Sequence, residues 1–510
     1  MKNSILVLDF GSQYNQLIAR RVRDMGVYTE VVPCNISIDE LKSYQPIGII
    51  LSGGPSSVFA ENAISIDPDI FNLNIPILGI CYGMQLTAHL LGGKVEKGVK
   101  GEYGKSKFKI LKPCKIFENI SEESIVWMSH FDEVVQVPYG FEIGGKSSAE
   151  IASFFDEEKK IYALQFHPEV SHSEEGSKIL ENFVFKVCEA SKNWKLTNFL
   201  DEEIQKIRDK VGDKKVILGL SGGVDSSVAA VLIHRAIGDQ LTCIFVDTGL
   251  LRWKEAEMVM QSYGEYFDIN IIKIDAKERF FKKLEGISDP EEKRKIIGHE
   301  FIAVFDEESS KIEGAAFLAQ GTIYPDVIES QSIKGPSAVI KSHHNVGGLP
   351  KEMNLKLLEP LRELFKDEVR KVGLELGIPH ELVYRHPFPG PGLGIRILGE
   401  VTPDKVKILQ KADHIFIEEL RNADWYDKVN QAFVVLLPVK SVGVMGDERT
   451  YEYTAVVRSA DTVDFMSATW SKLPYELLEN VSSRIINEVK GINRVAYDIS
   501  SKPPATIEWE

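Results

Sequence analysis

Short runs of aliphatic and β-branched residues alternate with helical stretches from the start of the chain. In the first two thirds, such runs predict strands at 5–10, 28–33, 48–52, 75–80, 216–220, 241–246 and 269–274. Helical segments such as 16–25 lie between them. Repeated strand–helix units predict parallel sheets covered by helices, and the ligands of such sheets lie beyond the carboxyl ends of the strands.

The last part of the chain has a different pattern. A helical stretch, three apolar runs, a second helix and a last strand are predicted at 404–420, 432–437, 442–445, 451–457, 475–489 and 494–499. Consecutive strands with few crossover helices indicate an α+β module. The stretch before it, 386–394, holds three prolines and three glycines and is therefore not expected to form regular structure.

These patterns predict an α/β protein with two doubly wound, mostly parallel-sheet domains and a C-terminal α+β domain. The polar stretch 192–198 is the natural linker between the first two. We place the domains at 1–195, 196–385 and 386–510. A chain of 510 residues is long enough for about three domains.

Composition narrows the class of protein. With 44% hydrophobic and 26% charged residues the chain is ordinary globular material, and its net charge of -15 argues against nucleic acid as a partner. Five cysteines are too few and odd in number for a disulfide framework, and the absence of any Cys-x-x-Cys pair argues against zinc. The first apolar run is too short for a signal peptide or a membrane span. We expect a cytoplasmic enzyme without membrane contact and without zinc, haem or flavin.

A candidate nucleophile lies where the apolar run 75–80 ends. In Gly79-Ile80-Cys81-Tyr82-Gly83, glycines flank the cysteine as in the elbow that lifts a nucleophile out at a helix N-terminus. The strand-like run before His167 supplies a base, and Glu169 can orient its imidazole. Each residue alone has a structural interpretation, but together they predict a catalytic triad. The cysteines without such an elbow are predicted to be structural: Cys34, Cys114, Cys188 and Cys243.

A second candidate site comes directly after the run 216–220. It is a glycine-rich turn that opens a helix and is made of Ser221, Gly222, Gly223, Val224, Asp225, Ser226 and Ser227. Free N–H groups at a helix start suit an anion, so the turn is predicted to hold phosphate. Asp225 and Asp247 are candidate magnesium or ribose contacts, with a helix cap or a turn as the alternative for either.

One motif is a decoy. The stretch 140–147 fits the letters Gly-x-x-x-x-Gly-Lys-Ser of a nucleotide-binding loop, which functions only between a strand and a helix. The residues after it predict a strand at 151–155, a polar turn and a second strand at 161–166, with no helix between them. We therefore assign the motif no nucleotide role.

The segments 53–55, 79–85 and 167–169 resemble the class I glutamine amidotransferases. The resemblance implies that Cys81 attacks the glutamine side-chain amide to form a glutamyl thioester and release ammonia, with His167 as base and then acid. It implies an oxyanion site at the N–H groups of Gly54 and Tyr82. The segment 128–132 resembles the family's glutamine pocket, with a plain strand-to-loop junction as the alternative. Implied glutamine contacts are Gln85 and Phe131.

The turn 221–227 resembles the pyrophosphate loop of the ATP pyrophosphatases, which cleave ATP to AMP and pyrophosphate. Magnesium at Asp225 is implied. Further implied ATP contacts are Val246, Gly321 and Lys341, the last in a polar segment, 341–348, that is expected to cover the phosphates.

The chain resembles the glutamine-hydrolysing GMP synthetase family over essentially its whole length. The resemblance lies in the order of the two halves and in the segments around Arg294, 321–326, 341–348, 386–394 and the tail 501–510. The resemblance implies amination of xanthosine monophosphate (XMP) to GMP through an adenylyl-XMP intermediate, with ATP and Mg²⁺. It implies a homodimer through the C-terminal module and XMP contacts at Arg294, Lys502 and Glu508.

Without the resemblance, 292–298 would be interpreted as a solvated helix face and 501–510 as a frayed tail. We expect the tail to be ordered only when nucleotide is bound. One alternative function is another ATP-dependent amidotransferase, which the segments downstream of residue 227 argue against. The other is a nucleotide sensor of the same fold without its chemistry. The presence of Cys81, His167, Glu169 and both loop glycines argues against that.

Overall fold

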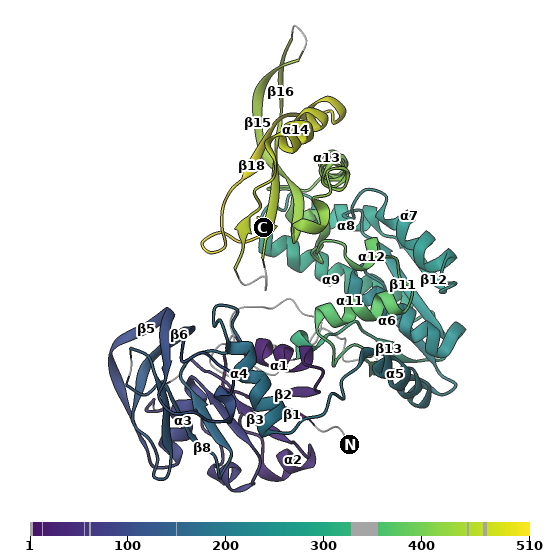
Figure 1. Ribbon diagram of the computed structural model, residues 1–510. Coiled ribbons are helices and arrows are strands. Elements are labelled where there is room, and N and C mark those ends of the chain that lie inside the picture. The colour runs from purple at the N-terminus through teal and green to yellow at the C-terminus, as the bar shows by residue number, and fades with distance from the viewer. Residues whose placement is uncertain are drawn as a thin grey trace. The chain divides into compact units, whose positions relative to one another are not determined.

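The computed structural model describes residues 4–12, 14–55, 57–60, 63–148, 150–327, 355–445, 448–462 and 467–510. The chain divides into two compact units (Figure 1). Unit 1 comprises Met1–Phe199 with Tyr324–Gly348, and unit 2 comprises Leu200–Ile323 with Leu349–Glu510. The domain boundaries predicted at 195 and 385 remain predictions.

Within the described residues, unit 1 is built on a nine-stranded sheet in the order β2-β1-β3-β4-β9-β8-β7-β5-β6. Its strands are β1 (Ile5–Asp9), β2 (Thr29–Pro33), β3 (Gly48–Leu51), β4 (Ile77–Ile80), β5 (Lys94–Ile110), β6 (Glu123–Gln136), β7 (Glu142–Lys146), β8 (Ser153–Asp156) and β9 (Ile161–Leu164). Its helices are α1 (Asn15–Asp24), α2 (Ile38–Ser43), α3 (Tyr82–Leu90) and α4 (Gly176–Asn182). The first five strands in this order, β2-β1-β3-β4-β9, are parallel to one another. This confirms the parallel sheet predicted for the first domain.

The other half of this sheet is antiparallel, and of its strands β5, β6 and β7 were not predicted. Strand β6 runs without a break through 128–132, so the alternative of a strand-to-loop junction there is wrong. The decoy motif forms strand β7, which pairs with β5 and β8, and no helix comes directly after it. The strand, turn and strand predicted after the decoy are confirmed as β8 and β9.

Unit 2 contains a parallel sheet in the order β12-β11-β10-β13-β14. Its strands are β10 (Lys215–Gly219), β11 (Leu241–Asp247), β12 (Ile271–Asp275), β13 (Ala315–Ala319) and β14 (Lys356–Leu358). Helix α5 (Leu196–Val211) begins in the last residues of unit 1 and continues into unit 2. The other helices of this part are α6 (Val224–Ile237), α7 (Glu255–Val259), α8 (Lys277–Leu284), α9 (Pro290–Ser309), α11 (Lys366–Glu375) and α12 (His380–Val383). Helix α5 begins inside the predicted linker 192–198, because Phe199, Leu200 and Ile207 form its buried stripe.

The C-terminal part of unit 2 is the predicted α+β module. It consists of α13 (Pro403–Asn422), β15 (Gln431–Met445), β16 (Glu448–Asp461), β17 (Thr469–Trp470), α14 (Tyr475–Glu488) and β18 (Ile492–Asp498). The runs predicted as two strands at 432–437 and 442–445 form one strand, β15, whose register shifts between Leu436 and Lys440. In Figure 1 the β15–β16 hairpin extends past α13 and α14.

A single hydrophobic core joins the parallel sheet of unit 2 to this module. Ile244 of β11 and Phe280 of α8 belong to the same buried cluster as Leu409 of α13 and Ile485 of α14. This shared core explains why 200–323 and 349–510 form one compact unit rather than two.

The C-terminal tail is packed against the module. The Ile507 side chain is buried with Phe433 and Val435, and the Trp509 Nε1 donates to Asp498 Oδ2 at 2.9 Å. These contacts come from the chain itself, and the expectation that the tail orders only with nucleotide remains a prediction.

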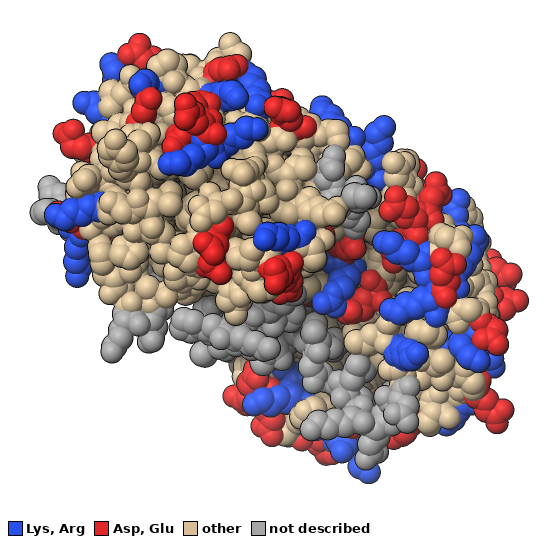
Figure 2. All heavy atoms as spheres, turned by 90° about the horizontal axis from the view of Figure 1, so that it is seen from below, with Lys and Arg blue, Asp and Glu red and all other residues tan. Residues whose placement is uncertain are grey.

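The surface shows no single dominant charge on the side that Figure 2 displays. Lys and Arg side chains are interspersed there with Asp and Glu side chains. Among the described residues, no helix combines the length and the apolar composition that crossing a membrane requires.

Candidate active sites

The candidate nucleophile lies at a strained turn between β4 and α3. Cys81 has φ of 52° and ψ of -104°, a backbone conformation that side-chain-bearing residues rarely adopt outside functional sites. The turn needs its flanking glycines. A Cβ on Gly79 would lie 2.7 Å from the Gly83 carbonyl oxygen, and one on Gly83 would collide with the Leu51 carbonyl oxygen. The local sequence therefore produces the predicted elbow.

The predicted base and its orienting group are in direct contact. The Nδ1 of His167 lies 2.7 Å from Oε1 of Glu169, and both side chains are buried. Burial alone would lower the pKa of His167, but the neighbouring Glu169 carboxylate and Cys81 sulfur outweigh it and hold this pKa well above its ordinary value. The His167 backbone is fixed as well, because its N–H donates to Trp127 O at 3.0 Å and its carbonyl accepts from Ser173 Oγ at 2.6 Å.

The nucleophile and the base lie beside each other. A Cβ on Gly53 would be 3.0 Å from His167 Cε1 and 3.7 Å from Cys81 Cβ, so one backbone position touches both. The Cys81 Sγ lies 3.5 Å from the Ser129 carbonyl oxygen on β6. The Tyr14 ring packs edge-on against the imidazole at 5.1 Å between centroids, a contact that the sequence did not indicate.

The remaining cysteines differ from Cys81 in their surroundings. All are unpaired, and burial raises the pKa of Cys34 to about 11 and of Cys114 and Cys243 to about 12. Burial likewise raises the pKa of Cys188. A thiol with a raised pKa is a poor nucleophile at neutral pH, which agrees with the structural role predicted for these four residues.

The predicted oxyanion donors lie together at the start of α3. Tyr82 is the first residue of the helix, so its N–H has no partner inside the helix. A Cβ on Gly54 would lie 3.4 Å from Tyr82 Cγ and only 2.8 Å from the Phe10 carbonyl oxygen, so glycine is needed where the two backbones meet. This arrangement fits an oxyanion site beside Cys81.

The two residues predicted to contact glutamine have different environments. The Gln85 side chain is buried, and its Nε2 donates to Asp132 O at 2.8 Å and to Gln165 Oε1 at 3.3 Å, so it ties α3 to β6. Phe131 on β6 is 40% exposed. Gln85 therefore acts on the β6 backbone next to Phe131, and direct contact of either residue with glutamine remains a prediction.

The predicted phosphate loop joins β10 to α6. Gly222 has φ of 75°, a conformation that glycine adopts without strain, and α6 begins at Val224. Inside the loop, Ser221 Oγ lies 2.9 Å from Ser226 Oγ and accepts from Gly223 N at 3.2 Å. Gly321 lies against the loop, because a Cβ there would be 2.9 Å from Ser226 N. The structure thus brings one predicted ATP contact from a distant part of the sequence to the loop.

The carboxylates of this region divide into two kinds. Asp225 Oδ2 lies 2.5 Å from Lys366 Nζ, and its buried Oδ1 has no hydrogen-bond partner among the described residues. Asp247 instead accepts from Gly249 N at 3.1 Å and pairs with Lys277 at 3.1 Å, which is the turn alternative. Val246 is buried in β11, and Lys341 lies outside the described residues.

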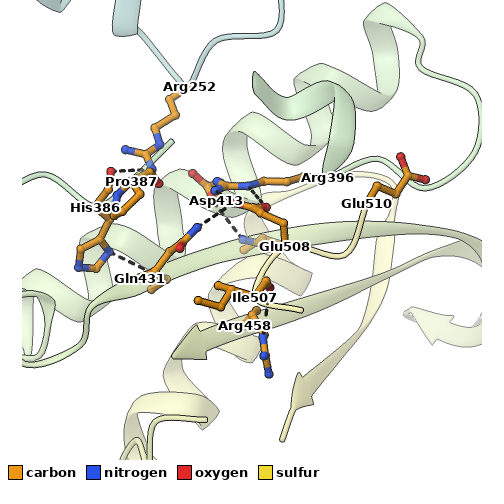
Figure 3. Close-up of polar contacts among 12 residues, drawn as sticks. Arg252, His386, Pro387, Arg396, Asp413, Gln431, Arg458, Ile507, Glu508 and Glu510 are labelled. Carbon is orange, nitrogen blue, oxygen red and sulfur yellow. Dashed lines mark hydrogen bonds and ion pairs between the residues drawn. The ribbon is translucent and has the colours of Figure 1, made fainter. Parts of the chain in front are cut away.

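A third group of polar residues surrounds the tail (Figure 3). Glu508 Oε1 accepts from Arg396 Nη2 at 2.8 Å and from Gln431 Nε2 at 2.7 Å, while its Oε2 accepts from Arg396 Nε at 3.1 Å. Arg396 is fully buried, its guanidinium lies 4.1 Å from the Phe433 ring centroid, and its Nη1 has no hydrogen-bond partner among the described residues. The sequence predicted Glu508 but missed both of its partners, which lie 112 and 77 residues away.

The proline–glycine stretch 386–394 lies beside this group. Arg252 Nη2 donates to Pro387 O at 3.3 Å (Figure 3). The Arg252 guanidinium also lies over the Phe388 ring, 4.6 Å from its centroid. The Leu393 N–H donates to Leu250 O at 2.8 Å. The stretch is therefore fixed against the turn after β11, and Arg252 joins the residues near Glu508.

The remaining predicted XMP contacts have mixed outcomes. Arg294 on α9 donates to the Glu510 carbonyl oxygen through Nη2, and the neighbouring Lys293 is fully buried with its Nζ 2.5 Å from Glu510 Oε2. The interpretation of 292–298 as a solvated helix face therefore fails for Lys293 and Arg294, whereas Glu292, Lys295 and Gly298 are exposed. Lys502 pairs through its backbone with Ala468, with an N···O distance of 2.8 Å.

Known protein families match the chain along most of its length. Models of three families match: glutamine amidotransferase class-I at residues 6–187, NAD synthase at 194–291 and GMP synthase C terminal domain at 418–509. The chain is 65% identical to the glutamine-hydrolyzing GMP synthase of Fusobacterium nucleatum subsp. nucleatum over 510 residues, all of both chains. It is 59% identical to that of Aquifex aeolicus over all of both chains. With that of Brachyspira hyodysenteriae it shares 58% identity, over 100% of this chain and 99% of the relative.

Proposed function

The chain belongs to the glutamine-hydrolysing GMP synthase family, and from this premise we propose how its groups of site residues share the reaction. The enzyme is a ligase that converts XMP to GMP, with glutamine as nitrogen donor and ATP as co-substrate. Identity of 65% over the full length of both chains is the observation that carries this conclusion.

We assign glutamine hydrolysis to the residues around the elbow. Cys81 attacks the glutamine amide carbon, His167 takes the thiol proton and then delivers a proton to the departing ammonia, and Glu169 keeps the imidazole oriented. The short contact of 2.7 Å between His167 and Glu169 and the strained backbone of Cys81 support these roles. The N–H groups of Gly54 and Tyr82 stabilise the oxyanion that forms on the way to the thioester.

We assign the cleavage of ATP to the loop 221–227. The N–H groups at the start of α6 and the Ser221 and Ser226 hydroxyls hold the pyrophosphate that leaves when the XMP oxygen attacks the α-phosphate. Gly321, Val246 and Lys341 are the further predicted ATP contacts. An oxo group is a poor leaving group, so adenylation precedes displacement by ammonia.

The loop fits magnesium at one carboxylate. Asp225 Oδ1 is buried without a hydrogen-bond partner among the described residues, and a carboxylate oxygen with free lone pairs suits Mg²⁺. No cluster of three or more His, Cys, Asp or Glu is found in the described ranges, so the ion would take its other ligands from substrate phosphates and water. Bound Mg²⁺ would neutralise part of the pyrophosphate charge.

We assign XMP to the group around the tail. Glu508, held by Arg396 and Gln431, presents a carboxylate that suits a purine N–H, while Arg252, Arg294 and Lys502 supply positive charge for the phosphate. Arg252 was not predicted from sequence. Its Nε is buried and has no hydrogen-bond partner among the described residues, which supports its inclusion.

We further propose that the enzyme is a cytoplasmic homodimer that associates through the C-terminal module. The exposed apolar side chains of the β15–β16 hairpin, Val442, Val444 and Tyr451, support the dimer. Sedimentation equilibrium of the purified chain tests it, and a monomer at micromolar concentration would contradict it.

The Cys81→Ala variant tests the division of labour. It should lose glutamine-dependent GMP formation and keep ammonium-dependent formation, because only the first step needs the thiol. Cys34→Ala is the matched control and should keep both. Loss of both activities in Cys81→Ala would contradict the assignment, and failure of the wild-type chain to release AMP and pyrophosphate with XMP would contradict the function itself.

A further inference from the structure

A buried ion pair lies directly beneath the phosphate loop. Arg385, which comes shortly after α12, and Glu255, the first residue of α7, contact each other through Nη2 and Oε1, and both are more than nine-tenths buried. The second terminal nitrogen of Arg385, Nη1, donates to the Gly222 carbonyl oxygen at 2.5 Å. One guanidinium therefore binds the loop and its own counter-ion together.

The hydrogen bond from Arg385 to the Gly222 carbonyl bears on how the loop presents its backbone to a phosphate. A loop that binds an anion has to turn its N–H groups toward the ligand and its carbonyl oxygens away from it. The Gly222 carbonyl points to the buried guanidinium, while the adjacent residue Gly223 is exposed and opens α6. Gly222 also packs closely here, since a Cβ on it would lie 3.3 Å from Val259 Cγ2 and 3.5 Å from Glu255 Oε1.

Glu255 extends the contact to another part of the site. Its Oε2 accepts from the backbone N–H of Arg252 at 3.0 Å, and the side chain of Arg252 reaches Pro387. Burial alone would raise the pKa of Glu255, but Arg385 and Arg252 outweigh it and lower this pKa, which keeps the carboxylate ionised. The pair thus stays charged, and its partners belong to the loop and to the turn after β11.

From these contacts we propose that Arg385 is a positioning residue for the adenylation step, which holds the Gly222 carbonyl away from the pyrophosphate and so keeps the loop ready to bind it. Glu255 acts through Arg385 and not on the substrate. The inference rests on the proposed assignment of ATP cleavage to the loop 221–227, and it adds two residues that lie 163 and 33 positions beyond Gly222.

The test uses the full-length enzyme and inorganic pyrophosphate as the probe. Arg385→Met alone would leave a buried uncompensated carboxylate, so it is combined with Glu255→Gln. The double variant should show a KM for ATP and an inhibition constant for pyrophosphate that are each raised by about tenfold or more, the size expected from a lost charge-assisted hydrogen bond. Glutamine hydrolysis and the KM for XMP should change far less. A general loss of folding would not produce this selective effect on ATP and pyrophosphate.

Arg484→Met is the matched control, because Arg484 is an arginine of unit 2 whose partners Glu418, Glu419 and Glu488 lie on α13 and α14 and not at the phosphate loop. If the double variant does not fold, Arg385→Lys decides, since it keeps the buried cation but not the two-pronged geometry. Unchanged constants for ATP and pyrophosphate in a folded variant would overturn the inference. Absence of XMP-dependent AMP release by the wild-type enzyme would instead contradict the proposed function.

Discussion

The Nδ1 of His167 lies 2.7 Å from Oε1 of Glu169, only two residues further along the chain. The contact forms because the chain turns immediately after β9 and places both side chains in the buried space beside β6. A buried carboxylate at this distance holds the proton on Nδ1 and leaves Nε2 to face the nucleophile.

Replacing Glu169 with glutamine should therefore slow glutamine hydrolysis more than it weakens glutamine binding. The amide keeps the size of the side chain but no longer stabilises the imidazolium, and general acid–base catalysis contributes about 10²–10⁴-fold. We expect a fall in kcat within that range, measured by ammonia release. Ammonium-dependent GMP formation is the internal control and should be unchanged.

The same variant should change how stability depends on pH. The pKa of His167 is raised in the folded protein, so the Glu169–imidazolium attraction stabilises the fold fully below about pH 6.5 and is lost as pH rises through the raised value. The melting temperature of Glu169→Gln should thus fall furthest below wild type near pH 6 and approach it at high pH. Glu96→Gln, which removes an exposed carboxylate, should show no such trend, and a difference that grew with pH would contradict the assignment.

Replacing Gly83 with alanine should damage the elbow. A Cβ there would collide with the Leu51 carbonyl oxygen, so either α3 or β3 must move, at a cost of about 1–3 kcal/mol. We expect a lower melting temperature and a loss of glutamine hydrolysis. Gly298→Ala is the control: it lies inside α9 with no atom near its Cβ position and should be neutral or slightly stabilising.

Replacing Asp225 with asparagine tests the proposed magnesium site. The change removes a negative charge from an oxygen that has no hydrogen-bond partner among the described residues, so half-maximal pyrophosphate release should need about tenfold more Mg²⁺ or more. The measurement is a magnesium titration with ammonium as nitrogen source. Asp213→Asn, an exposed aspartate before β10, should leave the titration unchanged, and an unchanged curve for Asp225→Asn would remove this residue from the site.

Replacing Glu508 with glutamine should affect both stability and XMP binding. The fully buried Arg396 would lose its anionic partner, which costs about 3 kcal/mol in comparable buried pairs. We expect a lower denaturation midpoint in urea and a raised KM for XMP, with glutamine hydrolysis retained. A variant with normal XMP kinetics would show that Glu508 serves only to neutralise Arg396.

Prediction from sequence succeeded where a backbone conformation depends on neighbouring residues. The elbow at Cys81 and the loop at Gly222 are local backbone devices that need glycine at defined positions, so their letters identify them. The decoy at 140–147 shows the limit of such local patterns. It has the letters of a nucleotide-binding loop, and only its neighbouring strands, β5 and β8, exclude that function.

The sequence by itself determined the alternation of strands and helices, the elbow at Cys81, the pair His167 and Glu169, and the strand–turn–helix at 221–227, because each depends on residues close together in the chain. Only the tertiary structure decided that Arg396 meets Glu508, that Arg385 meets Gly222, and that α13 and α14 share a core with the parallel sheet. These contacts join positions more than a hundred residues apart. They arise because buried surfaces pack together and buried charges must be paired. The sequence does not distinguish a buried arginine from an exposed one, so it did not indicate these pairs.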